Sequence, residues 1–136
     1  MTPWTDIKNK ILFSYMGTDW ISIEVQDTKA DDIELFLRNN IQLPNIDKDI
    51  LEFDNSNVNV FFYKDSDQHF DFDPRDIKTI NQWEQFLEIF KRISKTFKKN
   101  VLFRPEDNNG DLDSVLVRLT DDQVDYNFKV RDNYKE

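Results

Sequence analysis

The sequence predicts an α+β fold, in which a mostly antiparallel β-sheet packs against one long amphipathic helix and one or two shorter helices. Three observations indicate this class: a helical period between residues 79 and 97, alternating apolar segments joined by short turns, and a length of 136 residues. Strands joined by short turns pair in the antiparallel direction. The length suits a single domain, which we expect to span residues 1–136 with residues 131–136 frayed.

The N-terminal part is predicted to form a short helix followed by a strand. Thr2 is a good helix cap, and Pro3 suits the first helical position. Over residues 20–26, apolar residues alternate with Ser22 and Glu24. This period of two is typical of a half-buried strand.

A second helix is predicted to begin with Thr28 as its cap and to end at Asn39 and Asn40. Its apolar stripe is expected to consist of Ile33, Phe36 and Leu37. Residues 41–57 are interpreted as a loop. Four apolar side chains are expected to anchor this loop in the core: Ile46, Ile50, Leu51 and Phe53.

A β-hairpin is predicted next, with residues 58–64 paired to residues 69–73. The first of these segments carries valines and Phe62 on one face and Phe61 and Tyr63 on the other. Apolar residues on both faces are typical of a central strand.

The strongest periodic signal is a long helix that starts after Thr79. Thr79 and Gln82 are three residues apart and match a capping box. The apolar stripe of this helix is Ile80, Trp83, Phe86, Leu87, Phe90, Ile93 and Phe97. Strands are then predicted over residues 101–105, 114–120 and 124–130, with a polar loop after the first.

Composition excludes several classes of protein. The chain has no cysteine, so it has no disulfide framework, thiolate zinc site or cysteine nucleophile. The formal net charge of −9 repels nucleic-acid phosphates, so we expect no direct nucleic-acid binding. The first twenty residues lack a signal-peptide pattern, and no apolar run approaches the ~20 residues of a membrane span. We therefore expect a soluble, cytoplasmic protein that needs no cofactor.

Catalytic motifs are scarce. Two glycines are too few for a P-loop or a dinucleotide-binding fingerprint. If residues 69–73 form a strand, then His69, Asp71 and Asp73 project from one face, where imidazole and carboxylates would suit a divalent ion. The alternative is a solvated face of an edge strand, whose charges block aberrant pairing. We assign no catalytic residue and expect that the protein is not an enzyme.

Negative charge is concentrated in residues 31–76, which hold twelve acidic and four basic residues. Acidic clusters attract basic partners and speed their association. We therefore expect a protein-binding surface among the residues of this region. The candidate partner-binding residues are Asp49, Glu52, Asp54, Asp65, Asp67, His69, Asp71 and Asp73.

The segment from Trp83 to Glu106, a long aromatic helix that continues directly into a strand, resembles segments of small bacterial immunity proteins. Those proteins belong to polymorphic or contact-dependent toxin systems. The resemblance implies an acidic, cytoplasmic, single-domain α+β protein that binds a cognate toxin and occludes its active site. A basic toxin, such as a nuclease, would suit the charge of this chain.

Two other functions stay open from the sequence. One is a divalent-metal-binding module or small metal-dependent enzyme centred on His69, Asp71 and Asp73. The other is a DNA-mimic inhibitor of phage or host origin, which would use the same negative charge on a different partner.

Overall fold

The computed structural model describes residues 20–41, 45–46, 49–64, 68–105 and 115–126. The helix predicted after Thr2, the predicted loop after Pro105 and the frayed C-terminus lie outside these residues. Asp65 and Asp67 also lie outside them.

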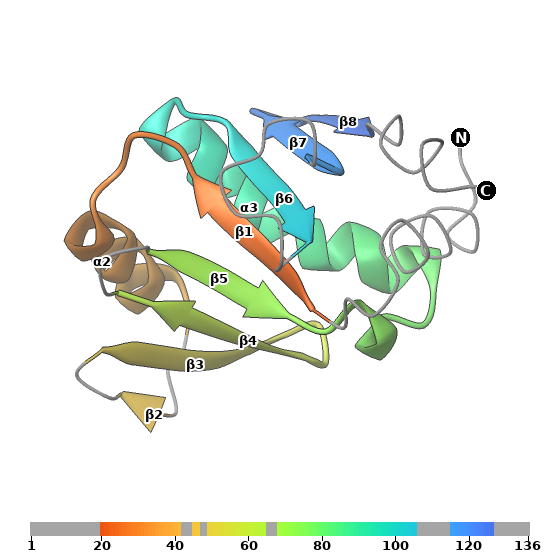
Figure 1. Ribbon diagram of the computed structural model, residues 1–136, viewed down its shortest axis with the longest axis horizontal. Coiled ribbons are helices and arrows are strands. Elements are labelled where there is room, and N and C mark those ends of the chain that lie inside the picture. Colours follow the sequence, from red (N-terminus) through yellow and green to blue (C-terminus); the bar gives the residue numbers. More distant parts are fainter. Residues whose placement is uncertain (1–19, 42–44, 47–48, 65–67, 106–114, 127–136) are drawn as a thin grey trace.

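The described residues form one antiparallel sheet of eight strands in the order β2-β3-β4-β5-β1-β6-β7-β8 (Figure 1). Every neighbouring pair is antiparallel. The strands are β1 (Ile21–Val25), β2 (Asn45–Ile46), β3 (Ile50–Asn55), β4 (Val58–Tyr63), β5 (His69–Phe72), β6 (Val101–Pro105), β7 (Val117–Thr120) and β8 (Gln123–Tyr126). The predicted α+β fold with an antiparallel sheet is confirmed.

Two α-helices accompany the sheet: α2 (Ala30–Asn40) and α3 (Ile80–Phe97). Figure 1 shows α3 crossing behind the sheet, with α2 beside it. A single 3₁₀ turn, η1 (Pro74–Asp76), lies between β5 and α3. Both helices direct their apolar stripes into one core, as predicted from the sequence.

Aromatic rings of α3 pack directly against the middle strands. Phe86 lies 4.5 Å from Phe72, and Phe90 lies 5.2 Å from Phe70, between ring centroids. All four side chains are fully buried. Burying a phenylalanine side chain contributes about 1.5–3 kcal/mol, so this layer supplies much of the stability of the fold.

The N-terminus of α3 confirms the predicted cap. The Thr79 side chain accepts a hydrogen bond from the Gln82 backbone N–H at 3.1 Å. The Gln82 side chain in turn accepts from the Lys78 backbone N–H at 2.6 Å, one residue before the expected position. The Thr79 hydroxyl thereby satisfies one N–H group that the helix leaves unpaired, and the Gln82 side chain satisfies an N–H just before the helix.

The start of α2 differs from the prediction. The helix begins at Ala30, with Lys29 rather than Thr28 at the cap position and no side-chain hydrogen bond there. Thr28 instead donates its hydroxyl to the Val25 carbonyl at 2.9 Å. The hydroxyl therefore closes the turn after β1 and does not begin the helix.

The loop predicted over residues 41–57 is wrong where the structure forms strands, at Asn45–Ile46 and Ile50–Asn55. Residues Ile50–Asn55 form β3, which pairs with β4 over its whole length. The hairpin turns at Ser56 and Asn57, whose φ angles of 55° and 67° are both left-handed, as a two-residue type I′ turn requires. Leu51 and Phe53 are buried, as expected of core anchors, but they are strand residues.

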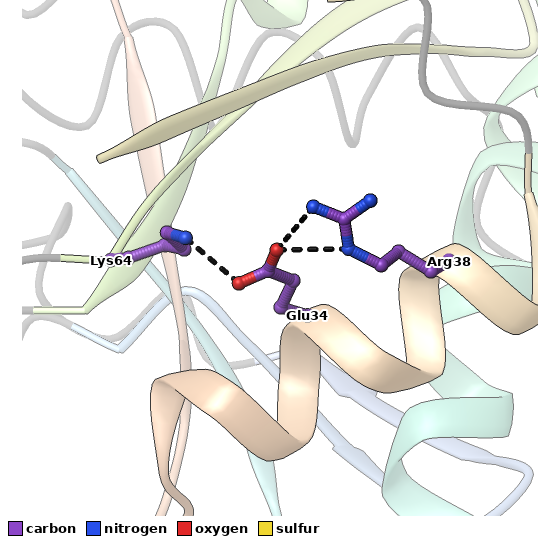
Figure 2. A network of polar contacts seen from close by, with 3 residues as sticks. All are labelled: Glu34, Arg38 and Lys64. Carbon is purple, nitrogen blue, oxygen red and sulfur yellow. Dashed lines mark hydrogen bonds and ion pairs between the residues drawn. The ribbon is translucent and has the colours of Figure 1, made fainter. Parts of the chain in front are cut away.

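A carboxylate ties α2 to the β4–β5 hairpin. Figure 2 shows Glu34 between Arg38, one turn further along α2, and Lys64, which follows β4. Glu34 Oε2 lies 2.6 Å from the Arg38 guanidinium, and Oε1 lies 2.8 Å from Lys64 Nζ. Hydrogen bonds from Lys64 and then Arg38 outweigh desolvation and lower the pKa of Glu34 below its ordinary value.

Replacing Glu34 with Gln tests this tie. Since the folded pKa is depressed, the stabilisation is fully present above the ordinary value of 4.5 and is lost as pH falls through the folded pKa. We expect Glu34→Gln to lower the free energy of unfolding by about 1 kcal/mol at pH 7 and the difference to disappear in acid. Urea unfolding at several pH values measures this. The exposed Glu84→Gln is the control, and an equal, pH-independent loss in both variants would contradict the assignment.

Ser94 fastens the C-terminal end of α3 to the β7–β8 turn. Its side chain is buried at 1% exposure within the apolar stripe. The hydroxyl donates to the Lys99 carbonyl at 2.7 Å and accepts from the Asp121 backbone N–H at 2.9 Å. The helix end beyond it turns through Lys98, which has a φ of 55°.

Removing this hydroxyl leaves two partly buried backbone groups, the Lys99 carbonyl and the Asp121 N–H, without this partner. We expect Ser94→Ala to lower the free energy of unfolding by about 1–3 kcal/mol, measured by denaturant unfolding. The exposed Thr96→Ala, two residues away on α3, should change it by about 0.5 kcal/mol or less. Equal stability of the two variants would show that the bridge contributes nothing.

Candidate functional site

Along each strand, side chains alternate between the core and the opposite face of the sheet. This opposite face is turned away from α2 and α3, and we call it the distal face. Phe70 and Phe72 contact α3, so His69 and Asp71 must point the other way. The same alternation places Glu52 and Asp54 on the distal face, because Leu51 and Phe53 are buried in the core.

A row of chemically distinct side chains crosses five strands of the distal face. Direct cross-strand pairing aligns Glu52 on β3, Phe61 on β4, Asp71 on β5, Ser22 on β1 and Arg104 on β6. The row therefore runs from a carboxylate through a ring, a second carboxylate and a hydroxyl to a guanidinium. Segments that are distant in sequence supply it, so only the folded sheet brings it together.

The part of the distal face on β5, β1 and β6 is here called the inner half. Its charged side chains interact with other side chains of the same half. Ser22 donates its hydroxyl to Asp71 Oδ1 at 2.8 Å, and Arg104 Nη1 donates to Glu24 Oε1. Asp71 and Arg104 are buried, at 5% and 7% exposure. Arg104 Nε is also buried and has no hydrogen-bond partner, so this half holds a guanidinium that is only partly satisfied.

These three positions, Ser22, Glu24 and Arg104, were not identified as site residues from the sequence. Arg104 interrupts an apolar strand, which is the one local sign of a buried charge. Its partner Glu24 is 80 residues away, so no local pattern connects the two.

His69 lies on the distal face between Tyr63 and Asp71. Its ring stacks on Tyr63, with centroids 5.0 Å apart and planes at 23°. Its Nε2 lies 3.4 Å from Asp71 Oδ1. β5 pairs with both β4 and β1, so the alternative interpretation of an edge strand is wrong, and so is the expectation that Asp71 is exposed.

Asp73 takes a different direction from the other two residues of the predicted metal set. Its side chain caps η1 by accepting from the Arg75 backbone N–H at 2.9 Å, and it pairs with the Arg75 guanidinium at 2.8 Å. Partial burial raises the pKa of Asp73, but the hydrogen bonds and charge of Arg75 outweigh burial and leave the pKa below its ordinary value. Among the described residues, no group of three His, Asp or Glu side chains is placed to hold a metal ion.

The outer half of the distal face, on β3 and β4, combines carboxylates with an aromatic ring. Glu52 and Asp54 are two residues apart on β3, about 6.6–6.8 Å along the strand. The Asn59 amide donates to Glu52 Oε2 at 2.8 Å. Phe61 is half-buried and packs against Trp20 with ring centroids 5.9 Å apart.

The structure thus divides the predicted partner-binding residues into three groups. Glu52 and Asp54 share the outer half. Asp49 is exposed just before the same strand, and its backbone carbonyl accepts a hydrogen bond from the Lys64 N–H at 2.9 Å. His69 lies at the boundary between the halves. Asp71 and Asp73 are engaged by Ser22 and Arg75.

Comparison of the chain with models of protein families, with curated proteins and with solved structures gave no match. Over the described part of the chain, neither helix has the length and apolar character needed to cross a membrane.

A double-mutant cycle tests the coupling of Ser22 to Asp71. We expect Ser22→Ala to lower the free energy of unfolding by about 1–3 kcal/mol, because it removes a donor from a buried carboxylate. In the Asp71→Asn background the same change should cost less, giving a coupling energy above about 0.5 kcal/mol in denaturant unfolding. Strict additivity of the two changes would contradict a direct bond between them.

Proposed function

We propose that this protein is a small acidic inhibitor that binds another protein through the outer half of its distal face, and that its partner is a cognate toxin, as for immunity proteins. The observation that carries this proposal is the exposure of acidic side chains at β3, where Asp54 on the strand and Asp49 just before it are both exposed. The carboxylate of Asp71 in the inner half is instead buried and accepts a hydrogen bond from Ser22.

Negative charge in this position favours a basic partner. Asp49, Glu52 and Asp54 follow one another along a single strand and its approach, and Asp49 and Asp54 are exposed. Complementary charge accelerates encounter and suppresses binding to acidic proteins. The overall charge of −9 adds to this attraction at long range.

The mechanism that follows is occlusion. Lysine and arginine side chains that line the substrate site of a basic toxin would pair with the β3 carboxylates. The rigid sheet would then cover that site and exclude the substrate. No bond is made or broken in this mechanism, so it needs neither a metal nor a catalytic residue.

The proposal predicts that a toxin gene lies next to this gene, and the effector domain of that toxin is the partner to test. We expect the pair Glu52→Gln and Asp54→Asn to weaken binding at least about tenfold in calorimetry, a loss of about 1.4 kcal/mol. Binding should also weaken as salt rises from 50 to 300 mM, because salt screens exposed charges. In cells, the double variant should protect less well against the toxin.

The matched control removes the same two charges from α2 by Asp31→Asn and Asp32→Asn, which are exposed on the other layer. We expect these changes to alter affinity by less than about threefold. Equal losses in the two pairs would show that only net charge matters, and no loss in the β3 pair would place the interface elsewhere. An effector domain that does not bind at all would overturn the proposed partner.

A further inference from the structure

The only histidine of the chain lies beside a buried carboxylate on the distal face. His69 Nε2 is 3.4 Å from Oδ1 of Asp71, whose side chain is 7% exposed. The same oxygen accepts a hydrogen bond from the Ser22 hydroxyl at 2.8 Å. Histidine is the side chain that ordinarily gains or loses its charge between pH 5 and 8. A group that becomes positive in this range is therefore placed against a carboxylate that the fold shields from water.

The position of the imidazole is set by the sheet. His69 is directly opposite Tyr63 across the β4–β5 pair, and the two rings stack with centroids 5.0 Å apart. Asp71 is two residues further along β5 on the same face, about 6.6–6.8 Å along the strand. The His69 side chain is 31% exposed, so its proton exchanges with solvent while the sheet stays folded.

Strand β5 lies between β4 and β1, and the side facing β4 brings no opposing charge to the ring. Tyr63 is a phenol with an ordinary pKa of about 10, so it is neutral near pH 7. Lys64 follows Tyr63, but its Nζ lies 2.8 Å from Glu34 on α2. That ammonium is therefore directed towards the helix.

The side facing β1 adds a second carboxylate. The register of β1 and β5 pairs Ile23 with Phe70, and continuing it by one residue places Glu24 opposite His69. Glu24 accepts a hydrogen bond from Arg104, which offsets its charge. Asp71 has no lysine or arginine in an ion pair within the described part of the chain, so its charge acts more strongly on the imidazole.

We propose that His69 and Asp71 form a pH-dependent ion pair, which is complete only when the imidazole takes up a proton. Protonation ensures that Nε2 carries a hydrogen to donate to Oδ1, and a charged donor strengthens the bond. The low exposure of Asp71 reduces screening by water. The stabilisation is fully present below the ordinary midpoint of histidine, about 6.5, and is lost as pH rises through the midpoint of the folded protein.

The pair is tested by a proton NMR titration of the full-length protein from pH 5 to 9, which follows the single imidazole. We expect a midpoint above about 6.5 in the wild type. Asp71→Asn should lower it, because this change removes the charge and keeps an acceptor for Ser22. Glu24→Gln is the matched control and should lower it less. A wild-type midpoint at or below 6.5, or equal effects of the two variants, would overturn the pair.

Urea unfolding gives a second measurement that does not require the Asp71 variant to fold. His69→Gln keeps a polar side chain that cannot take up a proton. The urea midpoint of the wild type should rise relative to that of His69→Gln as pH falls from 8 to 6, because the folded state then binds the proton more tightly. A difference between the two proteins that does not change with pH would contradict the proposal.

One consequence rests on the proposed function. Protonation of His69 removes one unit of negative charge beside the outer half of the distal face. The affinity of the wild type for the toxin domain should therefore fall about twofold relative to that of His69→Gln between pH 8 and 6. A toxin domain that does not bind would overturn the proposed partner, while the NMR titration would still decide the ion pair. A midpoint at or below 6.5 with normal binding would overturn the ion pair alone.

Discussion

The packing of aromatic rings between α3 and the middle of the sheet is the constraint on which the other features depend. Phe86 and Phe90 meet Phe72 and Phe70 at centroid distances of 4.5 and 5.2 Å, in a fully buried layer. Because strand side chains alternate, these contacts also fix what lies on the distal face. A slip of β5 by one residue would bury His69 and Asp71 under α3 and expose both rings to the other side. The polar row is therefore a consequence of the core.

Burial then separates structural carboxylates from those that are accessible to a partner. A buried charge is costly unless a hydrogen bond or an opposite charge compensates it. Asp71, at the centre of the sheet, accepts a hydrogen bond from Ser22, and Asp73 forms an ion pair with Arg75. Asp54 lies near the end of the sheet and is exposed, so it needs no such compensation. The position of a carboxylate in the sheet, more than its residue type, determines whether it is accessible to a partner.

Local patterns predicted what local interactions control. The period of α3, the Thr79 cap and the β4–β5 hairpin were all predicted from neighbouring residues, and the structure confirms them. β3 was not predicted, because its turn uses Ser56 and Asn57 in left-handed conformations and lacks the glycine that usually marks such a turn. The burial of Asp71 depends on its partner 49 residues away, which no local pattern reveals. The acidic character of residues 31–76 could be predicted from the sequence, but the division of the distal face into two halves could not.

Charge alone would not give the proposed interface a single partner. Charge acts at long range and attracts any basic protein, and salt weakens it. An inhibitor that must find one toxin among many basic proteins also needs contacts that form only with that toxin, because attraction alone does not discriminate. The pairing of β3 with β4 sets the positions from which Glu52, Asp54 and Phe61 would make such contacts, and the burial of Leu51 and Phe53 beneath the same strand fixes that pairing.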